Sequence, residues 1–289
     1  MQLGISDFYY DTDSVIPVAV RYRRFQEAGF SCIDFNTART DTPFYTTAPR
    51  ELEKLMGGIR TQIEDLGLRV HQVHGPWCWP PVKDTTSEGR VVRAGEMKRS
   101  ILTASLLGSK NWVVHPIMPY GIRDIPEGNA EKTWKVNAEF MSELLAYAKT
   151  LDVTICLENM PMRNFSMGRP ERILEFVREM DDPNFKICLD TGHVSYFPDL
   201  KVEEQVRLLG DQIRVLHVHD NGGEKDEHRY PGKGIIHWQS VADALKDIGF
   251  DGVFSLETAP ADELPEPEFV KELDVLSGIA REIVSQIEQ

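Results

Sequence analysis

The sequence predicts an α/β protein in which eight strands alternate with eight helices and close into a single (β/α)8 TIM barrel. Short apolar, β-branched runs recur along the whole chain, separated by longer amphipathic segments, which is the pattern of a parallel sheet. The 289 residues exceed the roughly 250 that such a barrel needs. An open doubly wound sheet is the alternative, but no GxGxxG follows the first run.

The predicted strands are short and bounded by polar or turn-forming residues. They cover residues 2–6, 31–36, 70–75, 111–117, 153–159, 185–190, 213–220 and 252–258. The clearest helix lies at 169–180, where an apolar stripe at helical spacing is formed by Ile173, Leu174, Phe176, Val177 and Met180. A last helix is expected at 267–288. No linker rich in Gly, Pro or Ser divides the chain, so we expect residues 1–289 to form one domain.

Charge and composition limit the classes of partner. The formal net charge of -14 repels polyanions and the sequence has no run of Lys and Arg, so no nucleic-acid partner is expected. No window approaches the roughly 18 apolar residues of a membrane span and no signal peptide is recognisable, so we expect a cytoplasmic protein without membrane contact. The cysteines at 32, 78, 156 and 188 lack CxxC spacing and are expected to pack in the core.

Acidic and imidazole residues stand at or near the ends of predicted strands three to eight. They are His74, His115, Glu158, Asp190, His219 and Glu257, separated by 41, 43, 32, 29 and 38 residues, or about one βα repeat each. Because inward-pointing side chains at the carboxyl ends of barrel strands meet at one face, we expect these six to converge. Cys156 and Cys188, two residues before Glu158 and Asp190, are small and apolar, as residues that fill a barrel tend to be.

Carboxylates that converge inside a barrel repel one another unless a cation lies among them. Glu158, Asp190, His219 and Glu257 form an oxygen-rich set that predicts one divalent metal ion, Mn²⁺, Mg²⁺ or Co²⁺, with Zn²⁺ as a further option. The alternative is a network of hydrogen bonds and salt bridges without a metal.

Other histidines and acids receive different expectations. His193, Asp226 and His228 stand in loops and could add metal ligands or bind the substrate, or could simply be polar residues beside a tight turn. His217 shares the parity of His219 and is expected one layer deeper in the barrel. His237 is expected only to begin a helix, and His71 receives no role.

Five segments, LENM, LDTGH, HVHD, DEHRYPGKG and SLET, together resemble the xylose isomerase-like barrel superfamily, which includes sugar-phosphate isomerases and epimerases, inosose dehydratases and endonuclease IV. In its ketose 3-epimerases one metal is held by Glu, Asp, His and Glu, and the two glutamates exchange the proton. The resemblance implies Glu158, Asp190, His219 and Glu257 as metal ligands, with Glu158 and Glu257 catalytic.

The same resemblance extends to endonuclease IV, whose zinc ions use nine ligands. Residues of the same type stand here at His74, His115, Glu158, Asp190, His193, His219, Asp226, His228 and Glu257. Two features depart from the superfamily. His237 replaces the Asp that usually follows the PGxG turn, which puts a helix cap in doubt. The epimerases also tend to carry an Arg soon after the strand-seven histidine, a place for which Arg229 is the candidate here.

These observations favour a metal-dependent isomerase or epimerase of a sugar, sugar phosphate or polyol derivative, acting through proton transfer next to a carbonyl and a metal-stabilised enediolate. Glu158 and Glu257 would remove and return the proton. The remaining candidates for substrate contact are His74, His115, His193, Asp226, His228, Arg229 and Trp77. Trp77, with Phe8, Tyr9 and Trp79, could cover the sugar ring or merely pack in loops, and Arg123, Arg163 and Arg229 are candidates for a phosphate.

Three other readings stay open. The same groups could eliminate a substituent, which would make the protein a lyase or dehydratase of a keto-sugar or keto-inositol, including keto-glycosides. A trinuclear zinc phosphodiesterase of the endonuclease IV type is disfavoured by the charge. A barrel that binds a sugar without converting it would be expected to lack one of the two glutamates. The resemblance also implies a possible homo-oligomer.

Overall fold

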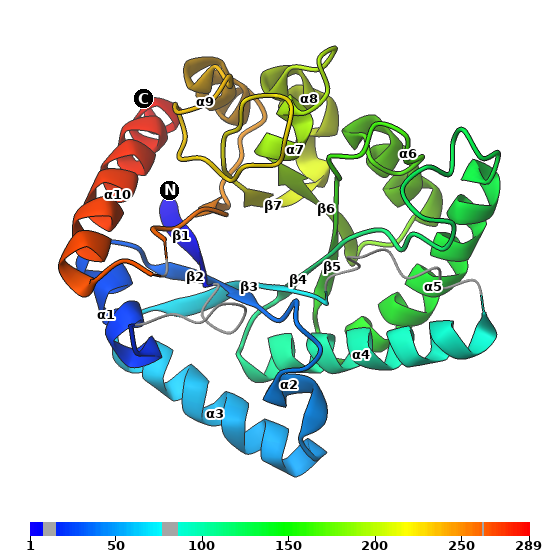
Figure 1. Ribbon diagram of the computed structural model, residues 1–289, viewed down its shortest axis with the longest axis horizontal. Coiled ribbons are helices and arrows are strands. Elements are labelled where there is room, and N and C mark those ends of the chain that lie inside the picture. Colours follow the sequence, from blue (N-terminus) through cyan, green and yellow to red (C-terminus); the bar gives the residue numbers. More distant parts are fainter. Residues whose placement is uncertain (8–15, 77–85, 262) are drawn as a thin grey trace.

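The computed structural model describes residues 1–7, 16–76, 86–261 and 263–289. Figure 1 looks along the axis of a ring of strands that is surrounded by helices. The strands are β1 (Gln2–Asp7), β2 (Cys32–Asn36), β3 (Arg69–His74), β4 (Asn111–Val114), β5 (Thr154–Glu158), β6 (Phe185–Asp190), β7 (Ile213–His217) and β8 (Val253–Leu256). Their order in the sheet is β7-β6-β5-β4-β3-β2-β1-β8. The predicted (β/α)8 barrel is therefore confirmed.

The barrel closes between β7 and β8 just beyond the end of β7. Val218 and Leu256 form a parallel bridge, in which the Val218 N–H donates to the Ser255 carbonyl over 2.8 Å and the Glu257 N–H donates to the Val218 carbonyl over 3.0 Å. The predicted strands 111–117, 213–220 and 252–258 were too long, because regular pairing stops at Val114, His217 and Leu256. His115, His219 and Glu257 thus follow their strands directly.

The helices are α1 (Val18–Glu27), α2 (Pro43–Thr46), α3 (Pro49–Asp65), α4 (Ser87–Leu106), α5 (Ala130–Thr150), α6 (Pro170–Met180), α7 (Thr191–Ser195), α8 (Val202–Leu209), α9 (Trp238–Asp247) and α10 (Glu266–Glu288), with a 3-10 turn η1 (Gly210–Gln212). The predicted stripe of α6 is buried at Ile173, Leu174, Phe176 and Val177, while Met180 at its end is half-buried. The short helices α2 and α7 were not predicted, since each is a single turn within a βα connection.

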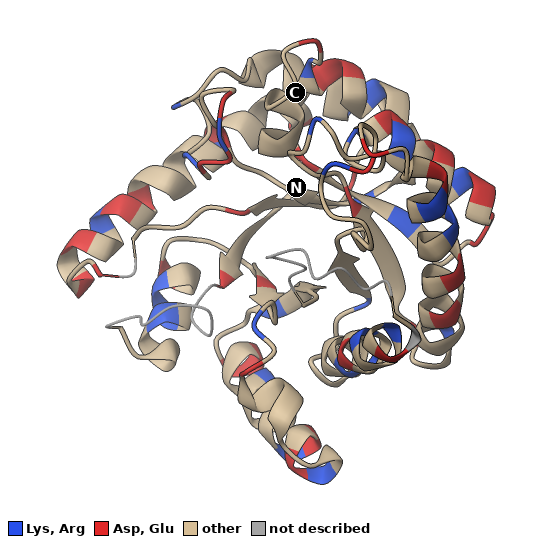
Figure 2. Ribbon diagram, turned by 45° about the vertical axis from the view of Figure 1, so that its right-hand side comes forward, with Lys and Arg blue, Asp and Glu red and all other residues tan. Residues whose placement is uncertain are grey.

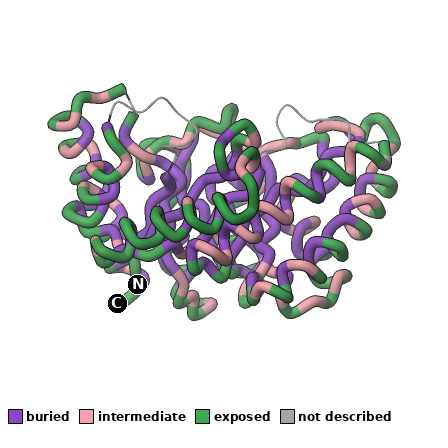
Figure 3. The backbone as a smooth tube through the Cα atoms, turned by 90° about the horizontal axis from the view of Figure 1, so that it is seen from below, coloured by how far each residue is buried: buried purple, intermediate pink, exposed green. Residues whose placement is uncertain are grey.

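Two apolar cores fill the molecule. The larger one lies between the sheet and the outer helices and includes Phe35, Trp112 and Phe254. The smaller one lies inside the barrel and consists of Val113, Cys156, Cys188 and Val215. In Figure 3 buried residues fill the centre of the molecule and exposed ones lie mainly on the outer helices. The inner cluster confirms the expected orientation of Cys156 and Cys188, so the next inward residues, Glu158 and Asp190, point toward the barrel mouth.

Cysteines 32, 156 and 188 are buried and free, as expected, and Cys78 lies outside the described residues. None of the described helices combines the length and the apolar character that a bilayer crossing requires. Figure 2 shows basic and acidic residues interspersed over the outer helices. The termini lie next to each other at one end of the barrel, where the Met1 amino group contacts the Glu288 carboxylate (Figure 3).

Candidate active site at the carboxyl end of the barrel

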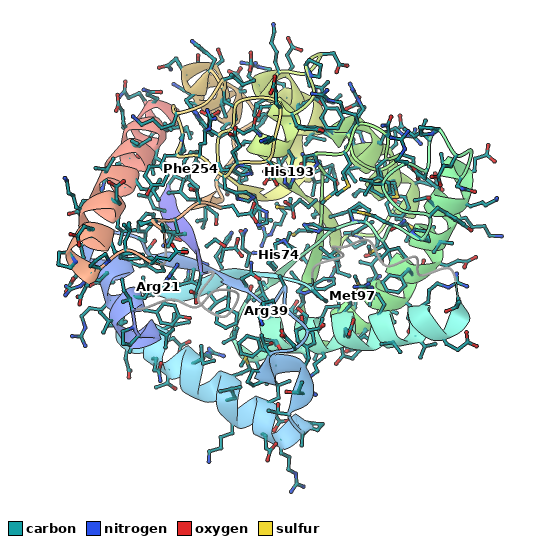
Figure 4. The ribbon with its side chains drawn as sticks, viewed as in Figure 1. Arg21, Arg39, His74, Met97, His193 and Phe254 are labelled. Carbon is teal, nitrogen blue, oxygen red and sulfur yellow. The ribbon has the colours of Figure 1, made fainter. Side chains whose placement is uncertain are left out.

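A cavity of about 420 Å³ opens at the carboxyl ends of β4 to β8. It is lined by His115, Met118, Ile122, Glu158, Met160, Pro161, Met162, His193, Tyr196, Asp226, His228 and Glu257. Figure 4 shows His74 and His193 inside the ring of strands. Asp190, His219 and His74 are buried and do not line the cavity itself.

The structure brings three of the four expected metal ligands, Asp190, His219 and Glu257, into one group, and Glu158 lies in a neighbouring group with Asp190 and His193. His219 Nε2 lies 3.0 Å from Asp190 Oδ2 and 4.0 Å from Glu257 Oε2. Glu158 joins them through His193, whose Nδ1 lies 3.5 Å from Glu158 Oε1 and 3.6 Å from Asp190 Oδ1. Potential ligand atoms of Asp190, His219 and Glu257 lie within 4.8 Å of one another, as do those of Glu158, Asp190 and His193.

The donor atoms of this cluster fit a cation. Glu257 Oε2 is buried and forms no hydrogen bond with the described residues, and Glu158 Oε2 faces His115 Nε2 at 3.2 Å. A buried, ionised carboxylate oxygen without a partner is costly, and a divalent ion removes that cost. Oxygen from three carboxylates and nitrogen from one imidazole suit Mn²⁺, Mg²⁺, Co²⁺ or Zn²⁺.

Three further histidines have the orientation typical of metal ligands. His74, His193 and His228 donate Nδ1–H to the carbonyls of Gly75, Asn159 and Glu257 over 2.8, 2.7 and 2.7 Å. Such a bond fixes the orientation of the ring and is typical of histidines that bind a metal through Nε2. Asp226 Oδ2 lies 3.2 Å from His193 Nε2 and 3.4 Å from His228 Nε2.

The segment after β6 shows why small residues separate Asp190 from His193. Asp190 accepts the backbone N–H of His193 over 2.6 Å and thereby caps α7. The Thr191 hydroxyl donates to the His219 carbonyl over 2.7 Å. A Cβ on Gly192 would lie 2.0 Å from the His219 ring, so only glycine lets this imidazole pack against the turn. The LDTGH segment therefore positions one acid and two imidazoles at once.

The environment drives the pKa values of the two glutamates apart. Burial raises the pKa of Glu158, but the charges of His217 and His115 outweigh burial and hold that pKa well below its usual range. Burial raises the pKa of Glu257 well above its usual range, and Glu158 adds to the increase. Two carboxyl groups with opposite shifts are the arrangement that assigns one as a base and the other as an acid.

The other buried groups form ion pairs. Burial raises the pKa of Asp190, but the charges of His193 and His219 outweigh burial and lower it to about 2. Burial lowers the pKa of His193, but Asp190 and Asp226 outweigh burial and raise it to about 10. His115 behaves differently, because burial outweighs Glu158 and lowers its pKa. The cavity thus presents a neutral imidazole beside charged ones.

His217 lies beneath both glutamates, as its parity predicted. Its Nδ1 is 2.9 Å from Glu158 Oε1 and 3.4 Å from Glu257 Oε2, and its Nε2 is 3.0 Å from Asp34 Oδ2. The ring stacks on His74, with centroids 5.5 Å apart. Asp34 was missed by sequence reasoning, although its place in the middle of an apolar strand was a usable signal.

The loop from β7 to α9 is organised by a second missed residue, Asp220. This buried carboxylate accepts the backbone N–H groups of Gly232 and Ile236 over 2.9 and 3.2 Å and the Trp238 indole N–H over 2.9 Å. His237 begins α9 as expected, and its side chain accepts the Ser240 N–H, so the cap that was in doubt is supplied by histidine. The loop carries Asp226 and His228 to the cavity.

His228 is held in an unusual backbone conformation. Its φ of 47° lies in the left-handed region that non-glycine residues rarely adopt. Its ring stacks on that of His219, with centroids 4.1 Å apart and planes 7° apart. Burial lowers its pKa, but Asp226 and Glu257 raise it to about 10. Strain of this kind is typical of functional sites.

Several expected substrate contacts are not brought into the cavity. Arg229 is directed to Glu227, at 2.7 Å, and Arg163 donates to the Tyr196 carbonyl over 2.7 Å. Arg123 is exposed and does not line the cavity. The expected cover, Phe8, Tyr9, Trp77 and Trp79, lies outside the described residues.

Replacing Asp220 by alanine should leave two buried donors, the Ile236 backbone N–H and the Trp238 indole N–H, without an acceptor. We expect the free energy of unfolding, measured by urea denaturation, to fall by more than about 2 kcal/mol. Asp274→Ala, an exposed change on α10, is the matched control and should stay within about 0.5 kcal/mol of the wild type. Equal stability of the two variants would contradict the organising role of Asp220.

Comparison with known proteins identifies the family and the relatives of this chain. Residues 22–278 match the family described as xylose isomerase-like TIM barrel. An uncharacterized protein of Methanocaldococcus jannaschii, MJ1311, is 36% identical over 203 residues, which are 69% of this chain and 68% of that protein. A D-psicose 3-epimerase of Ruminiclostridium cellulolyticum is 30% identical over 125 residues, or 43% of this chain and 41% of that enzyme.

Solved structures agree with the sequence relatives. The crystal structure of a D-tagatose 3-epimerase-like protein superposes with a TM-score of 0.77 at 25% identity, over 100% of this chain and 98% of the other. The resemblance inferred from the five sequence segments is thereby confirmed. This chain belongs to the xylose isomerase-like TIM barrel family.

Proposed function

We propose that this protein is a divalent-metal-dependent isomerase or epimerase that moves a proton next to the carbonyl of a sugar or polyol derivative. The observation that carries the proposal is a pair of glutamates, Glu158 and Glu257, that line one cavity and lie 2.9 and 3.4 Å from the same nitrogen, His217 Nδ1. The relatives named as sugar 3-epimerases support the same class of reaction.

The metal would be held by Glu158, Asp190, His219 and Glu257. Asp190, His219 and Glu257 form one group of potential ligand atoms, and Glu158 belongs to neighbouring groups that contain Asp190 or Glu257. When bound, it would supply positive charge that stabilises the negative charge developing on a carbonyl oxygen as the neighbouring carbon loses its proton. The residues of the chain would move the proton itself.

Glu158 is suited to accept the proton, since it lines the cavity and its pKa is held low. Glu257, whose pKa is raised, is suited to return one. In the reverse reaction the two roles exchange. His217, within 3.4 Å of both carboxylates, would keep them in place.

The lining histidines would orient the substrate. His115 Nε2 lies 3.2 Å from Glu158 Oε2, so a hydroxyl bound to this imidazole would lie beside the acceptor. His193 and His228 would hold further hydroxyls from the opposite side of the cavity.

Glu257→Gln should fold normally and lose turnover, because the amide keeps the shape of the side chain but cannot exchange a proton. The expected loss in kcat is at least about 100-fold, measured by chromatography as conversion of a ketose to its epimer or isomer. Glu272→Gln on α10 serves as the control and should retain wild-type turnover. Turnover of Glu257→Gln at the wild-type rate would exclude Glu257 as acid or base.

A second candidate, a trinuclear zinc phosphodiesterase, is favoured by one observation. His193, His219, Asp226 and His228 form an additional group whose potential ligand atoms lie within 4.8 Å of one another. Against it, none of the described residues that line the cavity is Lys or Arg, whereas phosphate contacts usually come from these residues.

We therefore expect no incision of a duplex containing an abasic site when zinc-loaded protein is incubated with it at low ionic strength. Gel electrophoresis of end-labelled DNA gives the result directly. Incision that disappears in Glu158→Gln would replace the sugar reaction by the nuclease assignment, and incision that persists would come from a contaminant.

A further inference from the structure

The cavity is lined by residues of two kinds. Six are the histidines and carboxylates described above, and the other six are mainly apolar: Met118, Ile122, Met160, Pro161, Met162 and Tyr196. We call these six residues the apolar wall. They come from the connections after β4 and β5 and from the end of α7. Nothing in the proposed proton transfer uses them.

The apolar wall is part of a built structure. Met118 and Met160 are 2% and 5% exposed. The Met160 N–H donates to the Gly168 carbonyl over 2.8 Å, which closes the loop after β5 on itself. A Cβ on Gly168 would lie 2.7 Å from the Met162 carbonyl oxygen, so this closure requires glycine.

Arg163, which does not line the cavity, connects the loops that carry the apolar wall. Its guanidinium lies 4.5 Å from the centroid of the Tyr196 ring and donates to the Tyr196 carbonyl over 2.7 Å and to the Gly223 carbonyl over 3.4 Å. These contacts join the loops after β5, β6 and β7. Arg163 therefore has a structural task and is directed to carbonyl groups.

The cavity offers no cationic side chain of the kind that usually binds a phosphate. None of the described residues that line it is Lys or Arg. A phosphate dianion bound here would meet thioether and aliphatic groups without a guanidinium or ammonium partner.

We infer, on the basis of the proposed function, that the substrate is a keto-sugar or keto-polyol derivative without phosphate, whose end remote from the reacting carbon is apolar. That end is the methyl group of a deoxy sugar or an apolar aglycone, and it lies against the apolar wall. A hydroxyl there would lose its hydrogen bonds to water without gaining a partner. Methionine side chains adapt their shape to an apolar group of either kind.

The inference is tested with metal-loaded protein and four probes: D-fructose, 6-deoxy-D-fructose, D-fructose 6-phosphate and a phenyl 3-keto-glucoside. Calorimetry gives the Kd of each, and deuterium uptake next to the carbonyl gives kcat/KM. We expect 6-deoxy-D-fructose or the phenyl glycoside to exceed D-fructose by roughly 10-fold to 100-fold in affinity. The preferred probe tells a methyl terminus from an aglycone. The 6-phosphate should bind more weakly than D-fructose.

Met162→Gln, which places an amide in the wall at similar volume, should reduce the preference for the apolar probe toward unity. Met180→Gln, at the far end of α6, is the control and should leave the preference unchanged. Equal or tighter binding of D-fructose than of both apolar probes, or tightest binding of the 6-phosphate, would overturn the inference.

The two proposals fail in different ways. Apolar preference in calorimetry without deuterium uptake from any probe would remove the proposed function and leave the apolar site. Deuterium uptake without apolar preference would keep the proposed function and remove the inference. Neither binding nor uptake for any probe would remove both.

Discussion

The close approach of three buried carboxylates is the constraint on which the rest of the site depends. Glu158 at the end of β5, Asp190 at the end of β6 and Glu257 just after β8 are at most 6% exposed. A buried carboxylate stays ionised only beside positive charge. His219 pairs with Asp190, and His217 lies between the two glutamates. A divalent cation would complete this balance.

The barrel meets that constraint by dividing its interior into layers. The apolar cluster around Cys156 and Cys188 fills the middle, and the following inward residues are polar. Glycine at 192 lets the His219 ring pack against the turn after β6, and Asp220 shapes the loop that brings in Asp226 and His228. Methionines line the same cavity and give part of it an apolar surface. The cavity thus combines ionisable side chains that can move protons with apolar side chains that can select a substrate.

Much of this was predictable because periodicity records which side of a strand is buried. The spacing of about one βα repeat predicted that the six residues from His74 to Glu257 lie at the same end of the barrel. The alternation along the strands, with Cys156 and Cys188 inside the barrel, predicted that Glu158 and Asp190 also point inward. Strand ends were overestimated at His115, His219 and Glu257, since an apolar run does not show where pairing stops. Asp34, Asp220 and the apolar wall were missed because their roles depend on contacts between segments far apart in sequence. Arg229 was predicted to contact the substrate, but its guanidinium donates a hydrogen bond to Glu227 instead.

The central claim is that one divalent ion binds among Glu158, Asp190, His219 and Glu257. Anomalous scattering from a crystal soaked with Mn²⁺, recorded near the manganese absorption edge, locates the ion without reference to activity. We predict an anomalous peak in contact with all four side chains. Absence of a peak among them, with Mn²⁺ bound elsewhere or not at all, would contradict it.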